Sequence, residues 1–306
     1  MRTILLLGLL TLIGCSNPKG EKESVSLSKT ELEKYDDLVW SAMLHYKGKD
    51  FENSLSNLRD AFEIKADQGV SDYFYASAAA LNLNKDSLAK KLITDAITKT
   101  DASEKYFDNF NEFDPFRVKE LFSVIKKNYA KHKAEYLNNL KHPEIYMEIE
   151  SLLEKDQKVR TESRSKKEIR KTDSINISRL IEINKKYGWQ KKQWLLLWHH
   201  RSIHRDHNYV WNFFRPFINR KIEEGELRKS FWARFDDEKS MFSEDRVQIY
   251  GTYWNNYNQF PIKDIDKVDS LRHTVGLPPL AYMEKVYGLA LPEGYDGKLP
   301  LRMYKK

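Results

Sequence analysis

The chain has 306 residues, of which 41% are hydrophobic and 32% are charged, and its formal net charge is +7 at pH 7. Only 12 Gly and 9 Pro stand beside 7 Trp, 17 Tyr and 15 Phe, which excludes a disordered or collagen-like chain. The single Cys excludes a disulfide framework, and the single short apolar run excludes a membrane protein with several spans. The length predicts two domains.

The first residues have the pattern of a signal peptide. Arg2 precedes an apolar run over 4–13, which is too short to span a bilayer of ~30 Å as a helix. The tetrad 12–15, Leu-Ile-Gly-Cys, resembles a bacterial lipobox. The resemblance implies that 1–14 is removed and that Cys15 becomes the acylated first residue of the mature chain. An ordinary signal peptide followed by a chance cysteine is the alternative.

The acylated Cys15 would anchor the chain in a lipid bilayer, because each buried CH₂ of an acyl chain such as palmitate contributes ~0.8 kcal/mol. Ser16 follows the cysteine. By resemblance to the usual sorting rule, a serine there favours the outer membrane, and we expect the periplasmic face rather than the cell surface. Residues 15–29 are mostly polar and predict a flexible tether. Acylation would also remove the only thiol, which excludes cysteine catalysis.

Positive charge is concentrated in the middle of the chain. Residues 116–205 carry 22 Lys and Arg against 11 Asp and Glu. A solvated helix face is the favoured interpretation, and contact with anionic lipid headgroups or with the acidic N-terminal half is the alternative. We expect no nucleic-acid partner, because an exported lipoprotein rarely meets one.

Residues 30–136 show apolar residues at helical spacing, and two segments match at an offset of 35 residues. The matching positions are Leu58 with Ile93, Ala61 with Ala96, and Phe62 with Ile97. Breaks at 47–50 and 82–86 separate the helices of each pair, and 101–130 forms a third unit that ends the array. The pattern resembles tetratricopeptide repeats. The resemblance implies a scaffold that binds a protein partner; a spacer or docking platform for the next domain is the alternative.

Residues 144–306 contain seven short motifs whose order resembles the domain of unknown function 6624 family. The motifs are Asp156-Gln157-x-x-Arg160, Asp173-x-x-Asn176-x-x-Arg179-Leu180, Lys186-Tyr187-Gly188-Trp189, the histidine-rich segment 199–207, Asp245-Arg246, Tyr250-Gly251-Thr252, and Val268-Asp269-x-x-Arg272-x-x-Val275-Gly276-Leu277-Pro278-Pro279-Leu280. Gln190, Tyr253 and the direct run from Asp245 to Tyr250 depart from the family pattern. The resemblance implies a domain boundary but no mechanism, because the role of that family is not established.

The C-terminal domain is predicted to be helical with one small β-hairpin. Helical spacing covers 144–185, with a charged break near 161–172, and 193–219, which ends near Pro216. Residues 247–254 and 259–262 are predicted to pair as strands. The fold class is therefore mainly α: a short tetratricopeptide-like half followed by a helical domain with this hairpin.

Histidines suggest a weak metal site. His200, His204 and His207 would share one face of a helix, and the pair His200 and His204 could hold zinc. Arg201 stands where the zincin pattern needs Glu. We therefore expect neither a metal nor a cofactor.

The motifs also supply a candidate polar site, with no complete catalytic motif beside it. Its members are Asp156, Asp173, Asn176, His200, Asp245, Arg246 and Thr252, with Arg160 beside them. Two carboxylates and a histidine could perform general acid–base work, and a buried network that fixes helix packing is the favoured alternative. The predicted function is an interaction or structural module; the alternative is a hydrolase acting on an envelope substrate. Sugar binding by the Trp-rich segment 187–260 is a third, weaker hypothesis, because a core explains those rings better.

Overall fold

The computed structural model describes residues 29–300 and 303, apart from 65–67, 164 and 191. The fold is mainly helical, as the sequence predicts. The signal peptide, Cys15 and the tether up to residue 28 lie outside the described residues. Across the described part, none of the helices combines the length and the apolar character that crossing a membrane requires.

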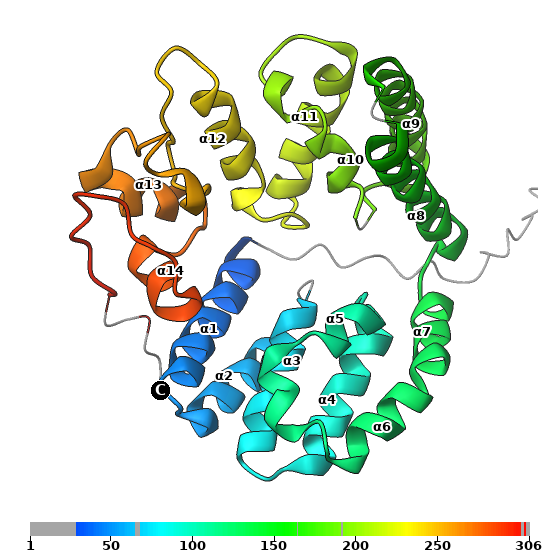
Figure 1. The fold of residues 1–306 in the computed structure, drawn as a ribbon, viewed down its shortest axis with the longest axis vertical. Coiled ribbons are helices and arrows are strands. Elements are labelled where there is room, and N and C mark those ends of the chain that lie inside the picture. Colours follow the sequence, from blue (N-terminus) through cyan, green and yellow to red (C-terminus); the bar gives the residue numbers. More distant parts are fainter. Residues whose placement is uncertain (1–28, 65–67, 164, 191, 301–302, 304–306) are drawn as a thin grey trace, which may run out of the picture.

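The first seven helices form one half of a closed ring (Figure 1). They are α1 (Lys29–Lys47), α2 (Phe51–Glu63), α3 (Val70–Asn82), α4 (Asp86–Lys99), α5 (Glu104–Asp108), α6 (Glu120–Lys127) and α7 (Tyr129–Asn138). The two predicted breaks lie between α1 and α2 and between α3 and α4. Asp50 caps α2 by accepting a hydrogen bond from the Asn53 N–H, whereas Asp86 lies in the first turn of α4 and pairs with Lys119.

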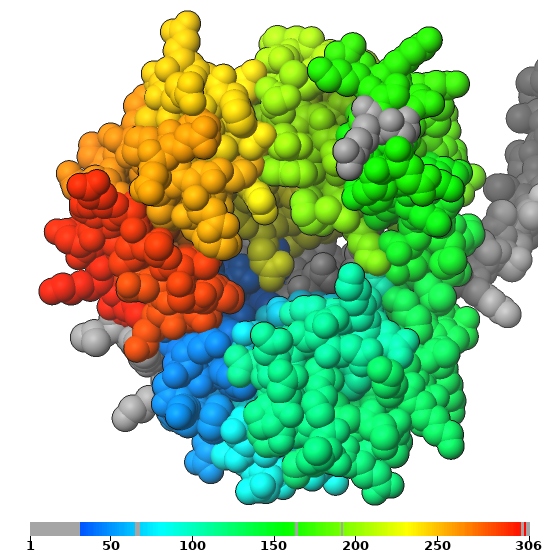
Figure 2. Space-filling view, viewed as in Figure 1, coloured from blue at the N-terminus to red at the C-terminus, as the bar shows by residue number. Residues whose placement is uncertain are grey.

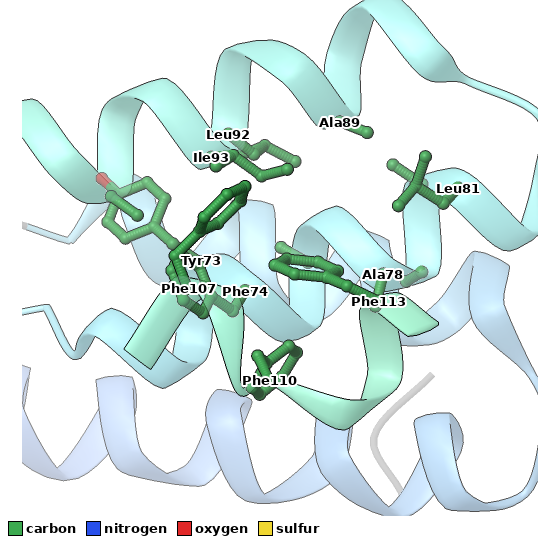
Figure 3. Packing of buried hydrophobic residues seen from close by; sticks show 14 of the residues in the cluster. Tyr73, Phe74, Ala78, Leu81, Ala89, Leu92, Ile93, Phe107, Phe110 and Phe113 are labelled. Atoms are coloured by element: carbon green, nitrogen blue, oxygen red, sulfur yellow. The ribbon is translucent and has the colours of Figure 1, made fainter. Parts of the chain in front are cut away.

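The matched positions of the two helix pairs lie in the core of this half. Leu58 and Ile93 are fully buried, and so are Ala61 and Ala96. The core is completed by the aromatic segment that follows α4, where Phe107, Phe110 and Phe113 surround Phe74 (Figure 3). The ring centres of Phe110 and Phe113 lie 5.3 and 5.2 Å from that of Phe74. Within this segment, Pro115 lies inside a short 3₁₀ helix, Asn111–Phe116.

The second half of the ring contains the remaining helices (Figure 1). They are α8 (Pro143–Lys158), α9 (Lys166–Tyr187), α10 (Trp194–Trp198), α11 (Tyr209–Glu223), α12 (Ala233–Met241), α13 (Val268–Thr274) and α14 (Leu280–Tyr287). The single helical stretch predicted over 193–219 is divided into α10, a 3₁₀ turn (Arg201–Ile203) and α11. Asn208 caps α11, and Pro216 lies within that helix instead of ending it.

The described residues contain no strand, so the predicted hairpin is not seen. Gln248 and Ile262 form one isolated parallel bridge. The Gln248 side chain donates to the Phe260 carbonyl at 2.9 Å and accepts from the Tyr253 N–H at 2.8 Å. The Gln248 side chain thus occupies backbone groups that would otherwise pair between two strands. As a result, 248–253 folds back as a loop, and no strand pairing continues beyond the single bridge.

Two junctions join the halves of the ring. At the first, Asp101 after α4 accepts a hydrogen bond from the Tyr146 hydroxyl of α8 at 2.7 Å and pairs with Lys133 and Lys192. At the second, α14 packs against α1, and Tyr282 and Val286 contact Met43 and Leu44 of the first helix. Figure 2 shows this contact on the surface, with the orange and red C-terminal part against blue α1.

The second junction also contains two ion pairs. Arg228, which lies just after α11, contacts Asp36 of α1 through Nε and Nη2 at 3.0 and 2.9 Å. Its neighbour Lys229 pairs with Glu33, one turn earlier on α1. Residues 228–229 therefore also hold the second half of the ring against α1.

Candidate functional site

One cluster of predicted site residues joins α8 to α9. Asp156 is only 1% exposed and accepts a hydrogen bond from Arg160 Nη2 at 3.1 Å. The same guanidinium also contacts Asp173 of α9. Burial alone would raise the pKa of Asp156, but hydrogen bonds from His199 and Arg160 outweigh it and hold the pKa below its ordinary value. Burial raises the pKa of Asp173 despite the same arginine.

The histidine that contacts Asp156 is His199. Its Nε2 lies 3.0 Å from Asp156 Oδ2, and 19% of its side chain is exposed. A buried carboxylate thus orients an imidazole that solvent can reach. The candidate polar site was predicted with His200 in this role, but the helix α10 ends at Trp198, and the contact with Asp156 is made by His199.

His200 lies in the same cluster but makes no comparable contact. Its Nε2 is buried and has no hydrogen-bond partner among the residues that the structure describes. Burial lowers the pKa of His200 to about 4, and the nearby side chains of His199 and Arg160 add to the effect. The imidazole is therefore neutral at pH 7.

Asn176 supports the same pair of helices. Its side-chain amide is buried and donates to the Leu152 carbonyl of α8 at 3.4 Å. This contact is structural: it fixes α9 against α8 beneath the Asp156 cluster.

Thr252 belongs to a second cluster, built around Asp237 of α12. The fully buried Asp237 carboxylate accepts hydrogen bonds from the backbone N–H groups of Ile249, Tyr250 and Thr252 at 2.6, 2.8 and 2.7 Å. The Thr252 hydroxyl adds a fourth at 2.8 Å. Burial still raises the pKa of Asp237. The sequence alone does not single out Asp237, because this residue stands in an acidic run, Asp236–Glu238, that resembles a solvated helix face.

Asp245 and Arg246 lie apart from both clusters. The Asp245 side chain is 61% exposed and pairs with Lys263 at 3.0 Å. Arg246 has a left-handed backbone, φ 51°, and its guanidinium lies over the ring of Phe260, 5.5 Å from the ring centre. The contacts of the predicted site residues thus fall into separate groups, and they do not form one joint acid–base pocket.

The weak metal candidates do not act together. His204 is buried, and its Nε2 lies 2.9 Å from Asp236 while its Nδ1 faces the Arg201 carbonyl. The break after α10 removes the helical spacing that would place His200 beside it. Within the described ranges, no group of three or more His, Cys, Asp or Glu side chains is arranged to hold a metal ion.

The last motif holds the chain that leads to α14. The buried Arg272 donates to the carbonyls of Pro278 and Tyr250 at 2.6 and 2.7 Å. Asp269 accepts from the Leu280 N–H at 2.8 Å and from the Tyr295 hydroxyl at 2.6 Å. These contacts position the helix that closes the ring.

A cavity of about 680 Å³ opens at that closure, between α1, α13 and the C-terminal segment. We call it the closure cavity. Its α1 wall consists of Glu33, Asp36, Asp37 and Trp40. These positions follow the i, i+3, i+4, i+7 spacing of one helix face. Helix α1 therefore presents an acidic and aromatic stripe to the cavity.

The opposite wall is formed by α13, with Ser270 and His273 both exposed toward solvent. The apolar part of the lining comes from Leu277, Pro279, Pro300 and Met303. The volume lies within the range of roughly 300–1,000 Å³ typical of small-ligand sites, which often occur between domains. No local pattern in the sequence indicates this site, because its walls are more than 200 residues apart in the chain.

Comparison with protein-family models, with curated proteins and with solved structures finds no match to this chain. The resemblance of 144–306 to the domain of unknown function 6624 family therefore stays a prediction. The same holds for the resemblance of 30–136 to tetratricopeptide repeats. A function is accordingly inferred from the geometry of the described residues.

Proposed function

We propose that the chain is a lipid-anchored binding module of the cell envelope, which holds a protein partner in the closure cavity. The observation that supports this is the cavity itself, because its wall combines a helix of the repeat half with α13 of the C-terminal half. Both halves are then needed for binding, and the tetratricopeptide-like repeats contribute through α1. The buried carboxylates of Asp156 and Asp237 are already engaged in structural contacts.

The anchor is part of the same proposal. Cys15 carries the acyl chains, the tether follows it, and the folded part stands on the periplasmic face of the outer membrane. The lipobox-like tetrad 12–15 and the absence of any other cysteine support this.

Replacing Cys15 by serine is expected to move the protein from the membrane to the soluble fraction. The reason is that the variant lacks the thiol that would receive the lipid. Cell fractionation and incorporation of labelled palmitate measure the effect. Ser16→Ala is the control and should stay in the membrane fraction with its label. Equal membrane content in the Cys15→Ser variant and the control would contradict the anchor.

Filling the closure cavity is expected to abolish partner binding. Ser270→Trp places an indole on the α13 wall, and the measurement is the amount of partner that co-purifies with the full chain after crosslinking. Ser270→Ala and Ser178→Trp, which adds the same ring on the exposed face of α9, should keep the partner. Undiminished co-purification with Ser270→Trp would refute the proposed site. Deleting 30–135 is a poorer test, because it would also expose Tyr282 and Val286.

A hydrolase is the second candidate function, favoured by one contact. Asp156 orients His199, and an imidazole held in this way can act as a general base. The test is hydrolysis of nitrophenyl ester, phosphate and glycoside substrates by the wild type and by His199→Gln. Activity that is lost in this variant, with little change in Tm, would favour the enzyme over the binding module.

A further inference from the structure

We infer that the closure cavity binds a basic, extended segment of the partner, whose lysine or arginine side chain enters between α1 and α13. The inference rests on the proposed function, since it names the chemistry of the partner at the same site. Three features support it: the charge of the walls, the aromatic ring on α1 and the apolar part of the lining.

The walls carry an excess of negative charge. Four carboxylates line the cavity, from Glu33, Asp36, Asp37 and Asp269, against the two ammonium groups of Lys229 and Lys298. Glu33 and Asp36 are compensated by Lys229 and Arg228 at the junction. The two hydrogen-bond donors of Asp269, the Leu280 N–H and the Tyr295 hydroxyl, are neutral and leave its charge in place. A cationic group is therefore the complementary ligand.

Trp40 favours an organic cation over a metal ion. It stands one turn beyond Asp36 and Asp37 on the same stripe of α1. Indole is the best aromatic partner for an ammonium or guanidinium group, and such a contact contributes about 0.5–2 kcal/mol. A carboxylate stripe that ends in an indole thus offers two kinds of contact to one cationic side chain.

The apolar part of the lining suits the stem of that side chain. Leu277, Pro279, Pro300 and Met303 supply it. Lysine and arginine bury their methylene groups on apolar surface while the charged end finds polar partners. The two prolines have no N–H, so they cannot donate to a peptide backbone as a sheet edge would. Recognition here relies on the side chain.

The test is calorimetric titration of the full chain in detergent with three blocked pentapeptides. They are acetyl-Ala-Ala-X-Ala-Ala-amide with X as lysine, norleucine or glutamate. The lysine and norleucine peptides share the stem and differ in the charge. We expect the lysine peptide to bind with a Kd of roughly 0.1–1 mM, the norleucine peptide to bind at least about fivefold more weakly, and the glutamate peptide not to bind.

Two charge variants and one control refine the test. Asp37→Asn should weaken the binding of the lysine peptide by about two- to fivefold, which is the range for one partly exposed ion pair. Lys298→Gln should strengthen the binding of this peptide, because it removes from the cavity wall a positive charge that repels the lysine side chain. Asp60→Asn changes an exposed carboxylate on α2, outside the cavity, and should have no effect.

The outcomes distinguish an error in the proposed ligand from an error in the proposed site. Equal binding of the lysine and norleucine peptides, or stronger binding of the glutamate peptide, would overturn the cationic ligand. If Ser270→Trp still abolished partner binding in that case, the site would stand with another ligand. If no peptide bound and Ser270→Trp kept its partner, both the ligand and the site would be refuted.

Discussion

Replacing Asp237 by alanine is expected to lower the free energy of unfolding by about 3–5 kcal/mol, because it breaks a buried hydrogen-bond network. The carboxylate is fully buried and receives four hydrogen bonds from 249–252. Alanine would leave these donors without an acceptor, and each buried donor that stays unsatisfied costs about 1–3 kcal/mol before the loop relaxes. Urea unfolding followed by circular dichroism measures the loss.

Asp245→Ala is the matched control for this prediction. It removes a carboxylate from a neighbouring motif, but its pair with Lys263 is exposed to solvent. Exposed pairs contribute about 0–1 kcal/mol. A similar loss in both variants would mean that Asp237 does not hold the loop. A large loss for Asp237→Ala alone would show that a residue outside every motif determines this part of the fold.

The wild type is expected to lose up to about 3 kcal/mol of stability between pH 6.5 and pH 4 through His200. The pKa of His200 is about 4 in the folded chain and 6.5 in its ordinary environment. Above pH 6.5 the imidazole is neutral in both states and contributes no pH dependence. Below pH 6.5 the unfolded chain takes up a proton that the folded chain refuses, so acid favours unfolding until the pH reaches 4.

The measurement is urea unfolding at pH 7.0 and pH 4.5 for the wild type and His200→Gln. Glutamine does not titrate, so the free energy of unfolding should fall less between pH 7.0 and pH 4.5 in the variant than in the wild type. The raised pKa of Asp173 and the lowered pKa of Asp156 act in both proteins, and their effects largely cancel in the difference. His207→Gln, at an exposed position, is the control. An equal drop in the wild type and in His200→Gln would refute the buried neutral histidine.

Local pattern was enough to predict the helix pairs. The apolar spacing around Leu58 and Ile93 has no competing interpretation, and both residues are fully buried. The breaks at 47–50 and 82–86 were predictable for the same reason, since Gly48 and the asparagines of the second break favour helix ends. Helices whose apolar faces repeat every turn thus follow from the sequence alone.

The conformation of 247–254 could not be predicted from its local pattern, because two side chains determine it. The β-branched and aromatic residues of 247–254 favour a strand. Gln248 and Asp237 instead bind the backbone N–H groups that a partner strand would need. One of these side chains comes from α12, so the competition is tertiary and does not show in the local pattern.

The candidate site was predicted in part. The sequence grouped Asp156, Arg160 and Asp173, and the structure brings them together. The prediction included His200 and not His199. Helix α10 ends at Trp198, and this helix end determines which of the two histidines faces the Asp156 carboxylate. The closure cavity was beyond reach, since nothing in a single sequence indicates that α1 and α13 meet.

The closed ring also has a consequence for the order in which the chain folds. Met43 and Tyr282 touch across about 240 residues of sequence, a separation that makes their contact slow to form. Domains generally fold in the order of synthesis, so α1 would be complete long before α14 exists. Until then Met43 and Leu44 present an apolar strip to water. A chain that stops before residue 280 would keep this strip exposed, and aggregation or proteolysis of the unfinished product is the expected fate.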